Sequence, residues 1–339
     1  EQYIRTAQET LAKILKVKEK EIFFTSGGTE SDNWALVGTA MANKRTGNHI
    51  ITSAIEHPAV SAPLAFLEEQ GFRITRLPVN KEGLVDVNEL EEAITPETIL
   101  VSIMYVNNEI GAVEPIGEIG RRIKAKNPKT YFHVDAIQAF GKYRIYPKRM
   151  GIDMLSVSGH KIHAPKGVGA LYLSDSLAQA FQPPYLGGEQ EREKRPGTEN
   201  LPYAVGLAAA VSRLSKNMKS RDTAVRALNQ QLREGLKAFP EVEINSPDSA
   251  VPEVLNFSEN CIKSETMLAY LAEQQIYVSS ASACGRGQPS HTLAAMGRDP
   301  LAIDTAIRVS FCADNTPEDV DAFLNRFEDG MKNLQKIRR

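Results

Sequence analysis

Short apolar runs alternate with longer amphipathic segments over the first two-thirds of the chain. The runs are rich in β-branched and aromatic residues and occupy positions 21–26, 49–54, 98–106, 131–136, 153–158 and 167–174. The segments between them, such as 29–44 and 115–126, have the length and the apolar spacing of helices. This order predicts βαβ units and a mostly parallel sheet covered by helices.

The pattern changes after about residue 200, where a long helical stretch covers 201–239. The strand-like runs that follow are fewer and more scattered, at 251–258, 276–280 and 306–311. A chain of 339 residues also exceeds the size at which one core usually keeps growing. We therefore predict a large α/β domain over residues 1–217 and a smaller α+β domain over residues 218–339.

Composition favours a soluble globular protein with a small-molecule ligand. The chain has 42% hydrophobic residues and a net charge of -2, which gives no electrostatic reason to expect nucleic acid or an anionic membrane as a partner. No apolar run approaches the ~20 residues of a membrane span. Three cysteines without a CxxC pair argue against a disulfide framework and a zinc site. We expect a cytoplasmic protein, or an organellar one in a eukaryote.

The chain begins within an amphipathic helical pattern and without an initiating Met. This start has no signal-peptide core. We expect that an upstream segment is absent from the sequence.

Polar and glycine-rich clusters follow five of the predicted strands. They occupy residues 26–30, 56–57, 107–111, 135–138 and 158–161. Ligands of a parallel sheet bind beyond the carboxyl ends of its strands, so these clusters are expected to converge on one site.

Lys161 follows the run 153–158 within the motif SGHKIHAPKG. Most lysines are solvated surface residues, and Lys166 in the turn-like Pro-Lys-Gly sequence is a competing candidate. An amine that is partly desolvated or close to other cations becomes a Schiff-base nucleophile, and His160 with the short polar loop provides such a setting. Lys161 is therefore the candidate Schiff-base lysine.

Asp135 ends the run 131–136. A carboxylate at a strand end is commonly a helix N-cap. Pyridoxal-phosphate chemistry supplies another reason, because a buried aspartate keeps the pyridine nitrogen protonated and lets the ring accept electrons. Gln138, one helical turn further on, is positioned to donate to the cofactor's phenolic oxygen.

Three further strand ends carry candidates that also have ordinary structural explanations. Gly28 and Thr29 follow a strand and open a helix, which makes an anion cradle or a common turn. His57 precedes Pro58 and is either a loop histidine or an imidazole that stacks on a ring and transfers protons. Asn108 belongs to a cluster for which turn formation is the alternative.

Seven motifs resemble, in order and spacing, those of the cysteine desulfurases: TSGGTESDN, EHPAV, VNNEIGAVEPI, HVDAIQAFGK, SGHKIHAPKGVGALY, RPGTEN and SACGRGQPSHTL. These are fold-type I pyridoxal 5'-phosphate (PLP) enzymes of the class V aminotransferase group. The resemblance spans nearly the whole chain. It implies a large α/β domain with a mostly parallel seven-stranded sheet, and a smaller α+β domain that carries a catalytic cysteine loop.

The resemblance implies roles for the residues around the cofactor ring. Lys161 would be the Schiff-base lysine, Asp135 the partner of the pyridine nitrogen, and His57 the ring-stacking base. Gln138 and Asn108 would contact the cofactor, and Asn108 would also contact the substrate.

Other residues would bind the cofactor's phosphate by the same resemblance. Gly28, Thr29, Ser158 and His160 would lie on the phosphate side. Thr198, in RPGTEN, would reach the phosphate of the neighbouring subunit's cofactor, which implies a homodimer with shared sites.

Two residues of the second domain would decide the reaction. Arg308 interrupts an apolar run, where a salt bridge or a solvated edge is the ordinary explanation, and the resemblance makes it the clamp for the substrate carboxylate. An unpaired cysteine such as Cys284 is by default incidental. The resemblance makes Cys284 the persulfide-forming nucleophile, and Arg286 and His291 are positioned in the sequence to lower its pKa.

The resulting hypothesis is a desulfurase that converts L-cysteine to L-alanine and places the sulfur on Cys284. An acceptor or scaffold protein would then collect the sulfur, for iron–sulfur cluster assembly or tRNA thiolation. Selenocysteine lyase, sulfide-releasing cysteine lyase, class V aminotransferase and a non-enzymatic scaffold remain alternatives. Only GRGQ separates Cys284 from Pro289, a shorter loop than in long-loop relatives.

Overall fold

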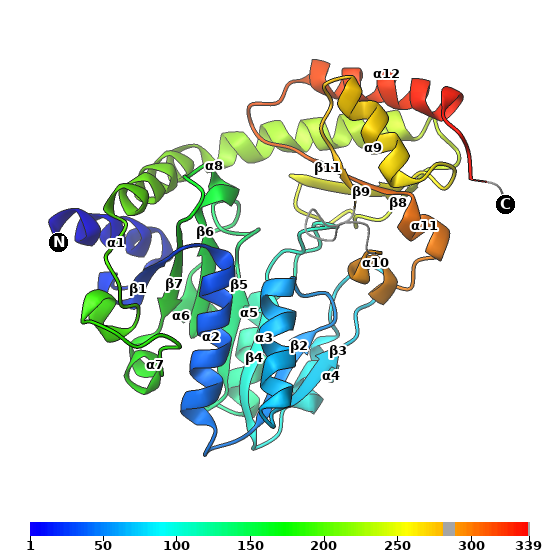
Figure 1. Ribbon diagram of the computed structural model, residues 1–339. Coiled ribbons are helices and arrows are strands. Elements are labelled where there is room, and N and C mark those ends of the chain that lie inside the picture. Colours follow the sequence, from blue (N-terminus) through cyan, green and yellow to red (C-terminus); the bar gives the residue numbers. More distant parts are fainter. Residues whose placement is uncertain (281–288, 338–339) are drawn as a thin grey trace. The chain divides into compact units, whose positions relative to one another are not determined.

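The chain forms two compact units (Figure 1). The structure is a computed structural model that describes residues 1–280 and 289–337. Unit 1 comprises Glu1–Pro78, Val85–Val106 and Glu114–Met218. Unit 2 comprises Val79–Leu84, Asn107–Val113 and the chain from Lys219 onward.

Two short segments before residue 218 therefore group with unit 2, which the sequence pattern did not indicate. Their apolar side chains explain the grouping, because Ile110 and Ala112 pack in one buried cluster with Leu293 and Ala306. The amide of Val251 also donates to the carbonyl oxygen of Gly111 at 2.9 Å. These loops follow strands of unit 1 in sequence but are held by unit 2.

Unit 1 is built on a seven-stranded sheet with the order β1-β7-β6-β5-β4-β2-β3. Its strands are β1 (Ile22–Thr25), β2 (His49–Ser53), β3 (Arg73–Leu77), β4 (Thr98–Met104), β5 (Tyr131–Asp135), β6 (Met154–Ser158) and β7 (Gly169–Leu173). The strands from β3 to β6 in this order are parallel, whereas β7 is antiparallel to β6 and β1. The α/β fold class with a mostly parallel sheet is confirmed.

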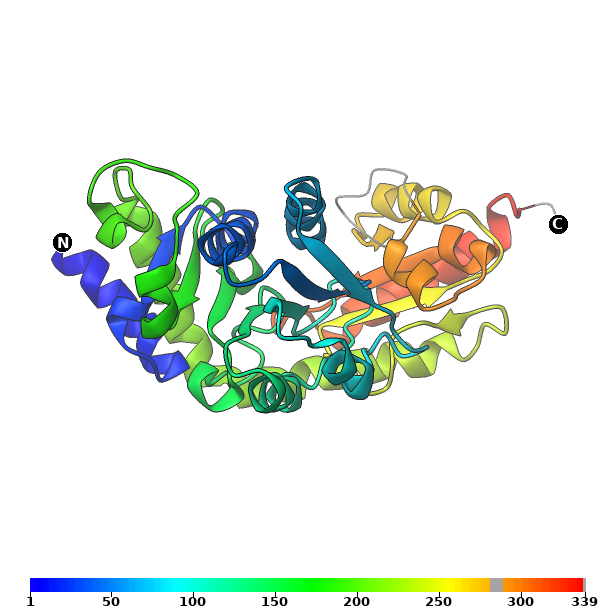
Figure 2. The ribbon, with the colours of Figure 1, turned by 90° about the horizontal axis from the view of Figure 1, so that it is seen from below.

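Helices cover both faces of this sheet, as Figure 2 shows, with α2 and α3 on one face and α4 and α5 on the other. The helices of unit 1 are α1 (Gln2–Leu15), η1 (Glu19–Glu21), α2 (Gly28–Asn43), α3 (Pro58–Glu69), α4 (Val87–Ala93), α5 (Ile116–Lys126), α6 (Pro147–Met150), η2 (Gly159–Ile162), α7 (Asp175–Ala180) and η3 (Gln190–Glu193). Because the central strands are covered on both faces, they are continuous apolar runs rather than alternating ones. Trp34 and Leu36 of α2 and Leu64 of α3 belong to the core packed on this sheet.

The six apolar runs that predicted strands correspond to six of these seven strands. β3 was missed, because its sequence RITRL carries two arginines and only Leu77 is buried. It lies at the edge of the sheet, where one neighbour and partial exposure remove the apolar signal.

Unit 2 contains a four-stranded antiparallel sheet with the order β10-β11-β9-β8. Its strands are β8 (Glu243–Ile244), β9 (Val254–Ser258), β10 (Ser279–Ser280) and β11 (Ala306–Ser310). Its helices are α9 (Ser264–Glu273), α10 (His291–Ala295), α11 (Pro300–Asp304) and α12 (Pro317–Asn333), and α8 (Leu201–Leu236) spans the boundary between the units. The core is aromatic, with Phe257 and Phe327 at 5.6 Å between ring centroids. No helix of the described chain has both the length and the apolar character to cross a membrane.

Two glycines of α5 provide a matched test of packing. A Cβ at Gly120 would collide with the carbonyl oxygen of Met150, whereas a Cβ at Gly117 would meet nothing within 4 Å. We expect Gly120→Ala to lower the free energy of unfolding by about 1–3 kcal/mol through overpacking. Gly117→Ala should raise it by about 0.4–1 kcal/mol, because alanine restricts the unfolded chain. Urea unfolding measures both, and equal effects would contradict the packing of α5 described here.

Candidate active site

The carboxyl group of Asp135 is buried at the end of β5. Its Oδ1 accepts a hydrogen bond from the amide of Ile137 at 2.9 Å, which is the local capping interaction that its position in the sequence suggested. Burial raises the pKa of Asp135 to about 6, and the Ile137 amide and the charge of Lys161 oppose this shift. Asp135 is thus a buried acid with one cation in its electrostatic reach.

Lys161 lies in η2, the single turn that directly follows β6. Its side chain is exposed, as is that of the competing Lys166. Of the two lysines, only Lys161 is among the groups whose charge acts on Asp135. In the same turn, the hydroxyl of Ser158 and Nδ1 of His160 are 2.8 Å apart. The predicted strand-end residues of β5 and β6 are therefore brought together.

The Gly27-Gly28 turn opens α2 beside these residues. Gly27 has φ 152°, a conformation that favours glycine. A Cβ at Gly28 would collide with the side chain of Ile137 and lie 3.5 Å from Cβ of Ser158. Thr29, the second residue of the helix, is exposed. The turn thus brings the backbone so close to the Ile137 side chain that only glycine fits, at a helix N-terminus whose first amide groups have no partner within the helix.

His57 is the N-cap of α3 and is half-buried. Its Nδ1 accepts from the amide of Ala59 at 3.1 Å, which leaves the proton of a neutral imidazole on Nε2. The preceding Glu56 is buried, and its Oε1 accepts from the hydroxyl of Ser53 at 2.6 Å and from the amide of Met104 at 2.9 Å. Glu56 therefore ties the ends of β2 and β4 together.

Gln138 and Thr198 have less defined surroundings. Gln138 is half-buried, and its Oε1 accepts from Nζ of Lys142 at 3.4 Å. Thr198 is exposed in the loop before α8 and lines a cavity of about 250 Å³ with residues that include Thr25 and Arg195. Arg195 pairs with Glu30 of α2 at 2.8 Å. These contacts hold the RPGTEN loop next to the end of β1.

Two predicted substrate residues meet within unit 2. Arg308 lies on β11 opposite Asn256, and its Nη1 donates to the carbonyl oxygen of Asn108 at 2.9 Å. Asn256 in turn donates to the carbonyl oxygen of Glu109 at 3.2 Å. Asn108 had been assigned to the first domain because it follows β4, yet its segment belongs to unit 2.

Cys284 lies outside the described residues, together with Arg286. The described chain on either side is anchored in unit 2. Upstream, Ser279 pairs with Arg308 in the β10–β11 register. Downstream, the hydroxyl of Ser290 donates to the buried carboxylate of Glu109.

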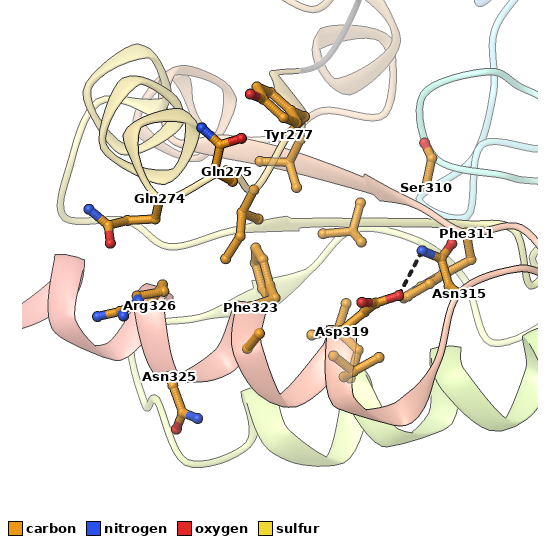
Figure 3. Close-up of a pocket in the computed structure, with 16 residues that line it drawn as sticks. Gln274, Gln275, Tyr277, Ser310, Phe311, Asn315, Asp319, Phe323, Asn325 and Arg326 are labelled. Atoms are coloured by element: carbon orange, nitrogen blue, oxygen red, sulfur yellow. Dashed lines mark hydrogen bonds between the residues drawn. The ribbon is translucent and has the colours of Figure 1, made fainter.

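One groove of unit 2 contains none of the predicted site residues. It measures about 790 Å³ and lies between α12, the segment before β10 and the end of β11 (Figure 3). Its walls include Tyr277, Asp319 and Phe323. Within the described chain, no group of three His, Cys, Asp or Glu side chains is arranged to hold a metal ion.

Comparison with known proteins identifies the family. A family model for class-V aminotransferases matches residues 1–323. The cysteine desulfurase IscS of Clostridium botulinum is 46% identical over 95% of this chain and 81% of its own length. That of Methanosarcina thermophila is 43% identical over 98% of this chain and 82% of its own length. A solved NifS-like protein has a TM-score of 0.92 and 37% identity, covering 98% of this chain and 88% of its own.

The chain therefore belongs to the class-V aminotransferase family, within its cysteine desulfurase group. Enzymes of this family use pyridoxal phosphate.

The residues at the strand ends of unit 1 fit that cofactor. Asp135 offers a buried carboxyl for a protonated ring nitrogen, and Lys161 offers an exposed amine within electrostatic reach of it. The amide groups at the N-terminus of α2 and the hydroxyl of Ser158 offer hydrogen bonds for a phosphate.

Sequence reasoning missed two buried polar residues behind Asp135, namely Asp32 and His133. Both are fully buried, and His133 interrupts the apolar run of β5 only two residues before Asp135. A polar residue inside an otherwise apolar strand was the available signal.

Glu56 makes the stability of the protein depend on pH. Burial raises its pKa from 4.5 to about 8, and the nearby Asp135 and Glu114 add to the shift while two hydrogen bonds oppose it. The contribution of Glu56 to the free energy of unfolding is fully present below pH 4.5 and is lost as the pH rises toward 8. The side chain of Gln cannot ionise. In Glu56→Gln we therefore expect the free energy of unfolding to be spared the fall of about 1.4 kcal/mol per pH unit that Glu56 causes in this range.

Urea unfolding of the cofactor-free protein between pH 5 and pH 8 measures this slope. Glu92→Gln, at an exposed position of α4, is the control and should keep the wild-type slope. A wild-type slope in Glu56→Gln would show that Glu56 is already ionised in the folded protein.

Proposed function

We propose that this protein is a PLP-dependent cysteine desulfurase that converts L-cysteine to L-alanine and forms a persulfide on Cys284. The observation that carries the proposal is the buried Asp135 carboxyl with Lys161 in its electrostatic reach, at the carboxyl end of the parallel sheet. The identity to cysteine desulfurases over nearly the whole chain supports the choice of reaction.

Several residues would hold the cofactor. Lys161 would carry it covalently, and Asp135 would pair with its ring nitrogen. His57 would lie against the ring, and Gln138 and Asn108 would contact its polar groups. The residues proposed for the phosphate are Gly28, Thr29, Ser158, His160 and, from a second copy of the chain, Thr198.

When bound, PLP withdraws electrons from the substrate Cα through its protonated ring nitrogen. Asp135 keeps that proton in place, because a carboxylate favours the charged form of a neighbouring base. Lys161 would take the Cα proton as an amine. Nδ1 of His57 accepts from the Ala59 amide, so a neutral imidazole would carry its proton on Nε2.

Arg308 would bind the substrate carboxylate, since a guanidinium matches two carboxylate oxygens. Its contact with the Asn108 carbonyl supports this role by restricting the side chain to one position. The thiolate of Cys284 attacks the substrate sulfur, so that an S–S bond forms while the Cβ–S bond breaks. Cβ takes the electron pair and a proton, and the products are alanine and the persulfide.

The fate of the sulfur and the assembly belong to the same proposal. An acceptor or scaffold protein collects the sulfur from Cys284. The exposure of Thr198 supports a homodimer in which this residue serves the neighbouring site. The three cysteines without a CxxC pair favour a reducing, cytoplasmic setting.

Lys161 can be tested by trapping the cofactor. After incubation with PLP and borohydride reduction, we expect wild-type protein to carry the cofactor's mass on the peptide that contains Lys161. Lys161→Ala should lose this adduct, because the amine whose charge acts on Asp135 is gone, and peptide mass spectrometry detects the change. Lys166→Ala, five residues further on and equally exposed, should keep it. An adduct on Lys166 would exclude Lys161 as the anchor.

Cys284 can be tested by mass spectrometry after incubation with cysteine. We expect one added sulfur on Cys284 in the wild type and none in Cys284→Ala. Alanine release should fall by several orders of magnitude, because the nucleophile is gone. The PLP adduct on Lys161 should remain in this variant.

Cys261→Ala and Cys312→Ala are the matched controls, since both are half-buried cysteines of unit 2 that form no disulfide. Both variants should form the persulfide at the wild-type rate. Undiminished alanine release by Cys284→Ala would contradict the proposed function.

A further inference from the structure

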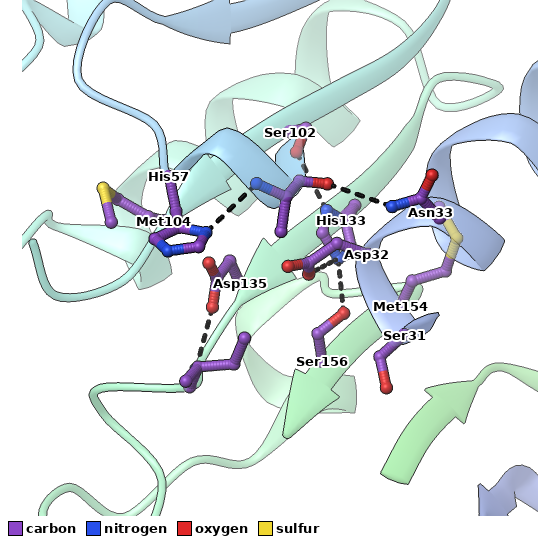
Figure 4. Close-up of polar contacts among 12 residues, drawn as sticks. Ser31, Asp32, Asn33, His57, Ser102, Met104, His133, Asp135, Met154 and Ser156 are labelled. Atoms are coloured by element: carbon purple, nitrogen blue, oxygen red, sulfur yellow. Dashed lines mark hydrogen bonds and ion pairs between the residues drawn. The ribbon is translucent and has the colours of Figure 1, made fainter. Parts of the chain in front are cut away.

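The strand that ends in Asp135 also carries a fully buried histidine. His133 precedes Asp135 by two residues on β5, so both side chains lie on the same face of the sheet. Its Nδ1 is 2.8 Å from the hydroxyl of Ser102 on β4, and its Nε2 is 2.9 Å from that of Ser156 on β6. Ser156 is the register partner of Asp135 (Figure 4). His133 therefore bridges the strands on either side of the Asp135 strand.

Helix α2 adds a carboxyl group to this cluster. Asp32 is fully buried, and its Oδ1 lies 3.5 Å from Nε2 of His133. Among the described residues, none lies in good hydrogen-bond geometry to either carboxyl oxygen of Asp32. A buried carboxyl group without strong partners keeps its proton. Burial, together with the charges of Asp135 and Glu56, raises the pKa of Asp32 well above its ordinary value against the opposing effect of the Ser156 hydroxyl.

Three carboxyl groups thus lie within mutual electrostatic reach, namely those of Asp32, Glu56 and Asp135. Like charges at such a site do not ionise together, so the group with the best partners takes the charge. Asp135 has the Ile137 amide and the charge of Lys161. Asp32 has neither, so the negative charge resides on Asp135.

A second buried histidine shows what a purely structural bridge requires. His49, the first residue of β2, lies 2.7 Å from the hydroxyl of Thr98 and 2.8 Å from that of Thr75. It is fully buried and joins strands on both sides, as His133 does. His133 has the carboxyl group of Asp32 within ion-pair distance. Within the described chain, no carboxyl group lies within that distance of His49. A histidine that bridges strands therefore does not require a buried carboxyl group beside it, so this role does not explain the presence of Asp32.

Resting on the proposed function, we propose that Asp32 and His133 form a positioning pair that leaves Asp135 as the single anion beside the cofactor ring. Asp32 remains a neutral acid and directs its proton to Nε2 of His133. His133 is then neutral as well, with Nε2 as the acceptor and its single ring N–H proton on Nδ1 facing Ser102. Burial lowers the pKa of His133 to about 3, which agrees with an uncharged ring.

The pair matters because a second anion would weaken the role of Asp135. A charged Asp32 would raise the affinity of the Asp135 carboxyl for a proton, which would then compete with the ring nitrogen. The charged and titratable groups that face the pair are Asp135 on β5, Glu56 after β2 and, through Asp135, Lys161 after β6. The hydroxyls of Ser102 and Ser156 complete its surroundings.

Three near-isosteric variants separate this role from a structural one. Asp32→Asn replaces a neutral acid by a neutral amide that cannot ionise. His133→Asn keeps a polar group near Ser102 and removes the one that faces Asp32 and Ser156. His49→Asn makes the matched change at the structural bridge. It keeps a polar group near the Thr98 hydroxyl and removes the one near the Thr75 hydroxyl.

The first readout is the pH titration of the visible absorbance of PLP bound to the holoenzyme. We expect an alkaline transition in the wild type when Asp32 ionises. His133→Asn should move its midpoint down by about one pH unit, a tenfold loss of proton affinity, because the acceptor of the Asp32 proton is gone. Asp32→Asn should abolish the part of the transition that Asp32 causes and leave the part that the nearby Glu56 causes, and His49→Asn should leave both in place.

The second readout is the free energy of unfolding of the cofactor-free protein against pH. The wild type should lose stability as the pH rises through the raised pKa of Asp32, and Asp32→Asn should lack this loss. Coinciding absorbance midpoints in all four proteins would overturn the proposal, as would equal shifts in His49→Asn and His133→Asn. A wild-type protein that binds no PLP would contradict the proposed function instead, and the unfolding measurement would still test the pair.

Discussion

The structure of this site depends on the burial of the Asp135 carboxyl group at the end of a parallel strand. A carboxylate removed from water must be compensated by hydrogen bonds or by opposite charge. The Ile137 amide provides the first, and Lys161, at the end of the neighbouring strand, provides the second. The turn after β6 and the start of the segment after β5 are therefore constrained together, although 26 positions separate Asp135 from Lys161.

The parallel sheet supplies this arrangement, because its strands all end at one edge. The local structural roles of the site residues also prepare their chemistry. His57 caps α3 through Nδ1, which determines the nitrogen that carries its proton. Asp135 accepts from the Ile137 amide, which stabilises its charged form. For these residues the structural and the functional explanations, which look like alternatives in the sequence, are compatible.

The sequence predicted those strands in which successive residues are all buried, because such strands are continuous apolar runs. Six strands of the large sheet are buried on both faces and are visible as apolar runs. β3 and the two-residue β8 were not visible, because an edge position or a short length removes the apolar pattern. The grouping of Asn108 with unit 2 was also hidden, since it results from packing against residues more than a hundred positions away.

The sequence by itself determined the α/β class, the order of the strands along the chain and the residues at their ends, because burial and turn chemistry act on neighbouring residues. It also carried the motifs that define the family. Only the tertiary structure decided which carboxyl groups share one electrostatic environment. Asp32 on α2 and His133 on β5 are about a hundred positions apart, and their contact at 3.5 Å exists because α2 packs on the face of the sheet that carries Asp135.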